Sequence, residues 1–171
     1  MKNEVIILTG EKQTGKTTFL QHWVNHRNDI AGFLSPVVDG KRFFYNIRER
    51  VLYNMEAEDA EKNVLRVGKF VFSVASFQKM SERLMDWAKE PEWKYIVLDE
   101  IGPLELQQQQ GLYEAFIYLL DNAASSLIVV IRESLLEMAA DICKKYRKDL
   151  KIVYISKVNA AGKSEDLEKF I

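Results

Sequence analysis

The sequence predicts an α/β fold with a mainly parallel central sheet. Apolar runs of strand length alternate with segments of helical period along the chain, which is the order that a parallel sheet requires. Two of the apolar runs, residues 95–98 and 127–131, have the continuous apolar character of strands that are buried on both faces. A chain of 171 residues has the usual size of one domain, so we expect residues 1–171 to form a single domain.

A glycine-rich turn separates the first strand from the first helix. Residues 5–8 are apolar and are expected to form the strand, and residues 16–25 carry apolar side chains on one helical face. The turn between them matches the pattern G-x-x-x-x-G-K-S/T of phosphate-binding loops, in the strand, turn and helix order that the motif needs. Together with the residue that follows, it reads Gly10-Glu11-Lys12-Gln13-Thr14-Gly15-Lys16-Thr17-Thr18.

Each part of this loop has a physical role in binding a triphosphate. Gly10 and Gly15 allow the backbone to turn tightly and to bring successive N–H groups around an anion. The helix that follows adds free N–H groups and the positive end of its dipole. We expect Lys16 to reach the β- and γ-phosphates and the Thr17 hydroxyl to bind Mg²⁺. Residues 10–18 are therefore predicted to bind a nucleoside triphosphate, with Mg²⁺ as the cofactor.

A β-hairpin is predicted after the first helix. Residues 30–38 are expected to form a strand that is interrupted at Pro36. Asp39-Gly40 then marks a tight turn between residues 36–38 and residues 42–47, as expected for a hairpin.

The middle of the chain is expected to add two strands and one helix. Residues 51–55 and residues 69–74 have the apolar runs of strands, and residues 77–87 have the apolar spacing of a helix. Residues 56–62 are acidic and polar, which fits either a solvated helix or a mobile loop.

Strands and helices alternate in the second half of the chain. In order, we expect a strand, a helix, a strand, a helix and a strand at residues 95–98, 112–120, 127–131, 134–146 and 152–155. Ser164 is placed to cap a short final helix.

Two carboxylates, Asp99 and Glu100, follow the buried strand at residues 95–98. Ligands of such sheets lie in the crevice outside the carboxyl ends of the strands, so we expect both side chains beside the phosphate loop. Asp99 is predicted to hold Mg²⁺ together with Thr17. Glu100 is predicted to orient or deprotonate a water molecule that attacks the γ-phosphate, which favours water as the acceptor over a second metabolite.

Arg132 follows the strand at residues 127–131 and is expected at the same edge of the sheet. Two interpretations remain open at this point. The guanidinium either contacts the γ-phosphate and stabilises charge in the transition state, or it forms a structural ion pair with Glu133 or Glu137. The predicted catalytic residues are Glu100, Lys16 and Arg132.

The composition favours a cytoplasmic protein without nucleic-acid or membrane partners. The 24 basic and 25 acidic side chains give a net charge of −1, so no excess of either sign points to nucleic acid or an anionic membrane. The single cysteine, Cys143, cannot form an internal disulfide, and we expect it to be a buried apolar side chain in a reducing compartment. No signal peptide and no apolar run of membrane-spanning length is recognised.

Two further groups of residues are expected to be structural or solvated. His22 and His26 have a spacing that can bind a metal, but no third ligand accompanies them, so we expect both to be solvated. Trp23, Trp87 and Trp93 are expected to pack in the core or at its edge, because no basic patch surrounds them.

With these residues in place, the chain resembles the small P-loop nucleoside-triphosphatases, a family that includes thermophilic and cancer-related members. The resemblance extends from the phosphate loop to about Ser156. Its strongest segment is Asp99-Glu100-Ile101-Gly102-Pro103-Leu104-Glu105-Leu106, which is similar to the family's Asp-Glu-Ile-Gly-Lys-Met-Glu-Leu. Weaker matches are Ala31-Gly32-Phe33, Asp39-Gly40-Lys41-Arg42, Val67-Gly68-Lys69-Phe70 and residues 128–133.

The resemblance implies a three-layer P-loop NTPase fold of the RecA/ASCE type with a β-hairpin extension. It also implies Mg²⁺-dependent hydrolysis of ATP, GTP and other triphosphates, with a broad base preference and slow turnover. Four positions depart from the family pattern. Lys12-Gln13 stands where the family usually has Pro-Gly, Pro103 where it often has Lys, and Phe43 where it usually has Gly.

Two other functions share the phosphate loop and stay open. A small nucleotide or nucleoside kinase needs an Arg-rich lid that shields the transfer from water, and after Ile131 the chain offers Arg132 and then no arginine before Arg147. A non-catalytic switch or adaptor uses the bound triphosphate to order a loop that a partner recognises. The preferred base, the protein partners and the oligomeric state are not predicted by the sequence.

Overall fold

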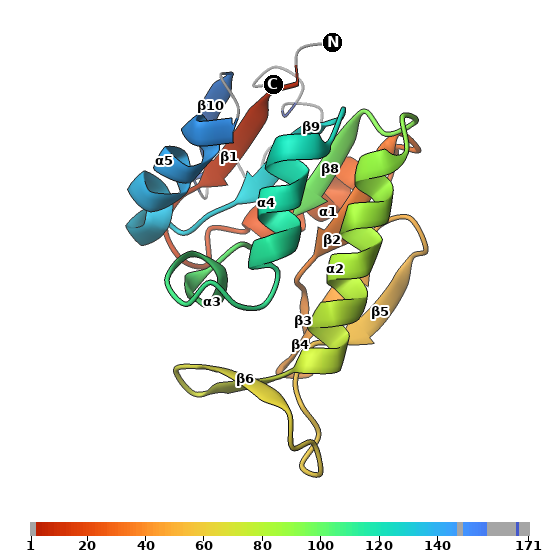
Figure 1. Ribbon diagram of the computed structural model, residues 1–171, viewed down its shortest axis with the longest axis vertical. Helices are drawn as coiled ribbons and strands as arrows, with labels where there is room; N and C mark the ends of the chain where they lie inside the picture. Colours follow the sequence, from red (N-terminus) through yellow and green to blue (C-terminus); the bar gives the residue numbers. More distant parts are fainter. Residues whose placement is uncertain (1–2, 147–148, 157–166, 168–171) are drawn as a thin grey trace.

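A sheet of parallel strands forms the centre of the computed structural model, which describes residues 3–146, 149–156 and 167. Five strands pair in parallel in the order β10, β1, β9, β8 and β2 (Figure 1). Their bounds, in that order, are Leu150–Tyr154, Val5–Thr9, Ser126–Val130, Tyr95–Leu98 and Ile30–Leu34. Strand β9 therefore separates β1, which precedes the phosphate loop, from β8, which precedes Asp99. This is the strand order of the RecA/ASCE type, as predicted.

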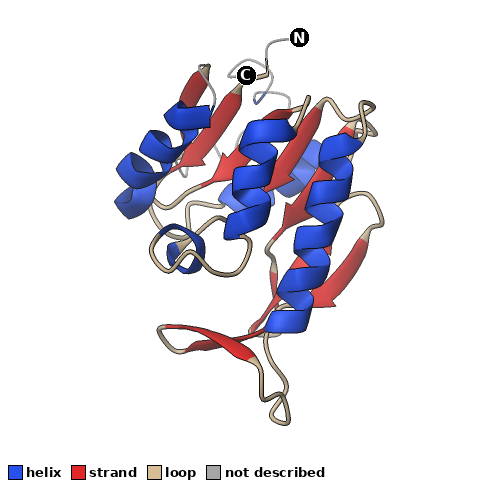
Figure 2. Cartoon of the chain, viewed as in Figure 1, coloured by secondary structure: helices blue, strands red, loops and turns tan. Residues whose placement is uncertain are grey.

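Helices cover both faces of the sheet and make three layers (Figure 2). Helix α1 lies on one face, and α2, α4 and α5 lie on the other (Figure 1). Their bounds are Lys16–Val24, Val74–Lys89, Tyr113–Asn122 and Leu136–Tyr146. Alternate side chains of β1 show why both faces are covered, since Ile6 and Leu8 pack with α1 whereas Val5 and Ile7 pack in the cluster of the other three helices.

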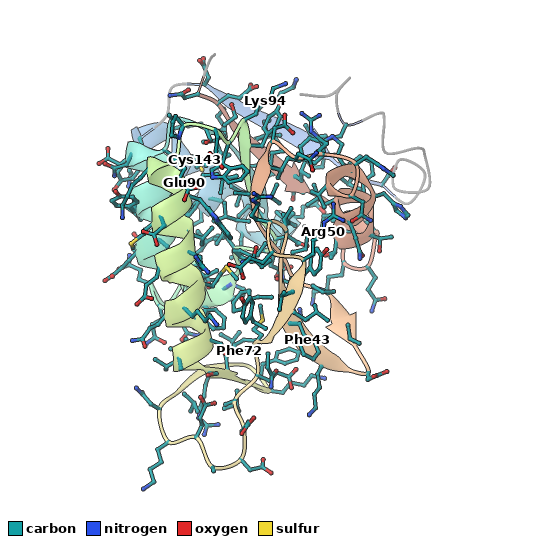
Figure 3. All side chains as sticks on the ribbon, turned by 90° about the vertical axis from the view of Figure 1, so that its right-hand side faces the viewer. Phe43, Arg50, Phe72, Glu90, Lys94 and Cys143 are labelled. Atoms are coloured by element: carbon teal, nitrogen blue, oxygen red, sulfur yellow. The ribbon has the colours of Figure 1, made fainter. Side chains whose placement is uncertain are left out.

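Two antiparallel units follow β2 in the chain and together form the extension: β3 to β5, which belong to the main sheet, and the hairpin of β6 and β7, which is a sheet of its own. Strand β4 pairs with β2 and carries β3 and β5 as antiparallel neighbours. A separate hairpin of β6 and β7 follows, and a bridge between Glu56 and Phe72 connects it to the residues after β5. Phe43 on β4 and Phe72 on β7 lie in the lower part of the molecule (Figure 3). The bounds of β3 to β7 are Val37–Val38, Lys41–Asn46, Val51–Asn54, Val64–Val67 and Phe70–Ser73.

The predicted α/β fold with a mainly parallel sheet and a hairpin extension is confirmed, and several boundaries differ from the prediction. The predicted interruption of residues 30–38 at Pro36 is confirmed, since β2 ends at Leu34 and β3 begins at Val37. Strand β6 was not expected, and the described residues 56–62 contain no helix. The predicted cap at Ser164 lies outside the described residues.

Two short helical segments complete the described elements. Helix α3 (Pro103–Leu106) was not predicted, and the 3₁₀ helix η1 (Glu133–Leu135) leads into α5. None of the helices in residues 3–146 combines the length and the apolar character of a membrane span.

Gly32 lies where the backbone of the neighbouring strand β8 leaves no space for a side chain on β2. It lies on β2 opposite Val97 on β8, with φ +116. A Cβ atom added at Gly32 would lie 2.0 Å from the carbonyl oxygen of Val97, a distance that no side-chain rotation relieves. A residue with a side chain would therefore push β2 away from the strand that carries Asp99.

We predict that Gly32→Ala lowers the free energy of unfolding by about 3 kcal/mol or more, because it combines a backbone clash with left-handed strain. Gly40→Ala is the matched control, since Gly40 has φ +77 but no atom within 4 Å of the added Cβ, and it should cost about 1–2 kcal/mol. Urea unfolding of both variants measures the difference. Equal losses would show that the close approach of β2 to β8 is not the constraint.

Candidate active site

The phosphate loop leaves β1 through a glycine that no other residue can replace without strain. Gly10 has φ 149, and a Cβ there would lie 2.3 Å from the carbonyl oxygen of Ile155. Gly15 has φ 84 and stands at the N-cap of α1, where it provides no side chain that would occupy the free N–H groups of the first turn. Gln13 also has a positive φ, 58, at a position where the resembled family usually has glycine. The backbone of the loop thus takes positive φ angles at Gly10, Gln13 and Gly15, and no side chain caps the first turn of α1.

The Lys16 side chain folds back over the loop. Its Nζ donates to the carbonyl oxygen of Glu11 at 2.6 Å, to that of Gly10 at 3.1 Å and to Thr14 Oγ1 at 3.2 Å. Burial lowers the pKa of Lys16, while the neighbouring carboxylates of Glu100 and Asp99 act in the opposite direction. The ammonium group is thus held at the loop and faces both carboxylates.

Asp99 is buried directly after β8. Its side chain is almost fully enclosed, and the backbone N–H of Ser35 donates to Oδ2 at 3.4 Å. The Ser35 hydroxyl also donates to the backbone carbonyl of Asp99. Burial raises the pKa of Asp99 to about 6, and a hydrogen bond from the Thr17 hydroxyl acts against this increase. A buried carboxylate beside a hydroxyl provides hard oxygen ligands for a divalent cation.

These two groups fit a Mg²⁺ ion that is held jointly by protein and substrate. Mg²⁺ usually takes one or two carboxylates, several waters and the phosphates of a substrate, so it needs no all-protein cage. In the described part of the chain there is indeed no cluster of three or more His, Cys, Asp or Glu side chains that could hold a metal alone. Asp99 and Thr17 are the residues that would hold Mg²⁺ beside a bound triphosphate.

Glu100 and Arg132 form an ion pair at the same edge of the sheet. Arg132 Nε donates to Glu100 Oε1 at 2.7 Å, and both side chains are partly exposed, at 32% and 26%. One of the two predictions for Arg132 was an ion pair with Glu133 or Glu137. The partner in the structure is Glu100 instead. Arg132 is therefore in direct contact with the carboxylate that is predicted to act on water.

A cleft of about 690 Å³ brings the predicted site residues together, with the exception of Glu11 and Thr18. It joins the phosphate loop to the ends of β8 and β9, and it is also bordered by residues of the extension that were not predicted as site residues. These residues are Arg42, Lys69 and Phe70. The sequence shows two basic residues near glycine turns, at Gly40 and Gly68, but no pattern in it indicates that these turns lie at the phosphate loop.

A buried carboxylate, Glu105, holds the segment that follows Glu100. Its Oε2 accepts from the backbone N–H of Gly102 at 3.0 Å, and its Oε1 accepts from that of Leu112 at 3.2 Å. Burial raises the pKa of Glu105 to about 7, and the two backbone hydrogen bonds reduce this effect. Glu105 thus ties both ends of the loop around α3 to one side chain.

The remaining predicted residues lie as follows. Glu11, Lys12, Gln13 and Thr18 are exposed, and Lys12 and Gln13 border the cleft. His22 and His26 are exposed, as expected for solvated side chains. The tryptophans are buried in the two core clusters. Cys143 lies on the buried face of α5, where burial raises the pKa of its thiol to about 12. These structural interpretations are confirmed.

Comparison with protein families places the chain among nucleotide hydrolases. The family described as NTPase matches residues 5–166, and the chain belongs to this family. This match confirms the prediction of a nucleoside-triphosphatase. No match is found among curated protein sequences.

Two solved structures share the fold. THEP1 from the hyperthermophile Aquifex aeolicus superimposes with a TM-score of 0.73 at 20% identity, over 95% of this chain and 96% of that one. The solution structure of a human cancer-related nucleoside triphosphatase superimposes with a TM-score of 0.69 at 22% identity, over 97% of this chain and 94% of that one. At this level of identity, the two structures confirm the fold.

We predict that Glu105→Gln removes a pH dependence of stability. With a pKa near 7 against an ordinary value of 4.5, the folded state holds the Glu105 proton over a range in which the unfolded state has lost it. The intact protein therefore loses stability as pH rises through this window, by roughly 3 kcal/mol from this group. Urea unfolding at intervals from pH 4.5 to pH 7.5 should show the stability of the intact protein falling relative to that of the variant. The exposed control Glu92→Gln should leave the slope unchanged, and parallel curves for Glu105→Gln would contradict the assignment.

Proposed function

We propose, from its membership of the NTPase family and from the composition of the cleft, that the chain is a Mg²⁺-dependent nucleoside-triphosphate hydrolase. It converts ATP, GTP and other triphosphates to the diphosphate and phosphate. A broad base preference and slow turnover follow from the resemblance to small P-loop nucleoside-triphosphatases. One observation carries the proposal, namely that the cleft joins the phosphate loop to Asp99 and to the Glu100–Arg132 ion pair.

The loop and Lys16 bind the triphosphate in this proposal. Backbone N–H groups between Gly10 and Gly15 surround the β-phosphate, and the N-terminus of α1 adds its positive dipole end. The Lys16 ammonium now donates to loop carbonyls, and it exchanges these neutral acceptors for phosphate oxygens, which carry charge and form stronger hydrogen bonds. Lys16 is thus a binding residue that also neutralises charge on the transferred phosphoryl group.

Glu100 acts on the attacking water. A carboxylate at the rim of the cleft can accept a proton from water or align it with the γ-phosphate. Arg132 holds one oxygen of this carboxylate, Oε1, so the other oxygen remains to contact water. We propose that Arg132 is a positioning residue that fixes the direction of Glu100.

Asp99 and Thr17 hold Mg²⁺ in this proposal. The ion neutralises charge on the phosphates when it is bound. Ser35 supports the site from β2's carboxyl end, because its N–H and hydroxyl groups hold the Asp99 side chain and backbone in place. This support keeps the carboxylate directed toward Thr17.

The structure offers little for the kinase alternative. A kinase lid would have to come from the segment after Arg132, but that segment is η1 followed by α5, and its Leu135, Ala139 and Ala140 are buried in the core. A helix that packs into the core is not free to close over a second substrate. The switch or adaptor alternative is separated from hydrolysis by the experiment below.

We predict that Glu100→Gln lowers kcat for phosphate release by about 10²–10⁴-fold, the usual effect of losing a general base. Triphosphate affinity should hold or increase, because one negative charge leaves the vicinity of the phosphates. Phosphate release and calorimetric binding of Mg-ATP measure the two quantities.

Lys16→Ala is the complementary variant for this experiment. It should lose triphosphate affinity as well as turnover, while its thermal unfolding without nucleotide stays near that of the intact protein. If Glu100→Gln releases phosphate at the parental rate, the assignment of Glu100 to the attacking water is wrong, and the switch or adaptor interpretation is then favoured.

A further inference from the structure

The extension brings a second arginine to the cleft. Arg42 on β4, together with Lys69 and Phe70 at the start of β7, borders the same space as Lys16 and Glu100. The catalytic hypothesis drawn from the sequence did not use these residues. They come from strands that are not part of the parallel core, so their position at the cleft needs its own explanation.

An aromatic ring fixes the position of the Arg42 guanidinium. The guanidinium carbon lies 4.8 Å from the centre of the Phe70 ring, and the Lys69 ammonium lies 5.5 Å from the same ring. Phe70 stacks in turn on Phe72, with ring centres 5.8 Å apart and planes only 4° from parallel. Cation–π contacts of this kind favour one orientation of an arginine while leaving its N–H groups able to donate. The backbone of Arg42 is also fixed, because its N–H donates to Glu56 Oε1 at 3.0 Å.

The charge of Arg42 is not neutralised by an acidic partner. Within residues 3–146, 149–156 and 167, no carboxylate lies within ion-pair distance of its guanidinium, and Glu56 accepts from its backbone instead. Arg132 differs in this respect, since its Nε is engaged with Glu100. Of the arginines that border the cleft in the described part of the chain, Arg42 is the one whose guanidinium has no carboxylate partner, so all of its donors can turn to an anionic ligand.

We propose that Arg42 is a catalytic residue that contacts the γ-phosphate and stabilises the charge that develops on it during transfer. The inference rests on the nucleotide site proposed above. It assigns to the sheet extension the delivery of an arginine from within the same chain, and to Phe70 the positioning of that arginine. Its N–H groups match phosphoryl oxygens in a fork that a lysine cannot reproduce.

The test compares triphosphate with diphosphate binding. Calorimetry would measure the affinity of Mg²⁺ with the β,γ-imido analogue of ATP, and of Mg²⁺ with ADP, for the intact protein, Arg42→Ala and Arg42→Lys. Arg66→Ala on β6 is the matched control, because it removes one exposed arginine of the same extension that does not border the cleft. Thermal unfolding of each variant without nucleotide checks that the fold is intact.

Arg42→Ala should bind the triphosphate analogue about tenfold or more weakly, as expected for loss of a hydrogen bond to a charged group. Its ADP affinity should remain within about twofold of the parental value, since the γ-phosphate is absent. The kcat for phosphate release should fall by about 10²–10³-fold, as for loss of one donor to a developing charge. Arg42→Lys should restore part of the affinity and little of the rate, and Arg66→Ala should match the intact protein.

An equal loss for both nucleotides, or no loss for either, would overturn the inference. If Arg42→Ala proves unstable, the same ratio of affinities measured on Arg42→Lys decides the question. The outcome is independent of the proposed hydrolysis. An intact protein that binds the triphosphate analogue but releases no phosphate would contradict the proposed function, whereas the affinity ratio would still test Arg42.

Discussion

The parallel register of β1, β9 and β8 places the phosphate loop, Asp99, Glu100 and Arg132 at one edge of the sheet. Leu8 on β1 is level with Val130 on β9, and Val129 on β9 is level with Leu98 on β8. Parallel strands end on the same side of a sheet. Each of these strand ends is therefore followed, within two residues, by a residue of the site: Leu8 by Gly10, Val130 by Arg132 and Leu98 by Asp99. On the side of β8 away from β9, Gly32 allows β2 to pair closely with β8. The pairing of the strand backbones is therefore what brings the side chains of the cleft into position for the proposed chemistry.

This geometry concentrates charge in a partly enclosed space. Asp99 and Lys16 are both desolvated, and burial alone would favour the neutral form of each. Such a site reduces the stability of the ligand-free protein, as is common where residues are arranged for function. A Mg²⁺–triphosphate complex would supply charges of both signs to these groups, so binding should be coupled to a gain in stability. The extension adds the positive charges of Arg42 and Lys69 to the cleft, and these charges increase the electrostatic attraction of the cleft for a polyanion.

Sequence patterns predicted the residues of the loop and the strand ends because both depend on short-range order. Gly10, Lys16 and Asp99 lie in or directly after segments whose period and turn chemistry are visible in the chain. The partner of Arg132 was not predictable from helix spacing, because Glu100 is 32 residues away and meets it only through the pairing of β8 with β9. Arg42 and Phe70 escaped the prediction for the same reason. Their position at the cleft follows from how β6 and β7 fold relative to β4, which no local pattern encodes.

We propose that this cleft hydrolyses nucleoside triphosphates with water as the acceptor. The most direct test is phosphate release by the unmodified protein from ATP, GTP, CTP and UTP, with and without Mg²⁺, and with nucleosides or monophosphates added as possible acceptors. We expect steady, Mg²⁺-dependent release from each triphosphate at similar rates, with no stimulation by an added acceptor. Release that requires an acceptor, or ATP that stays bound and intact over hours, would contradict this proposal.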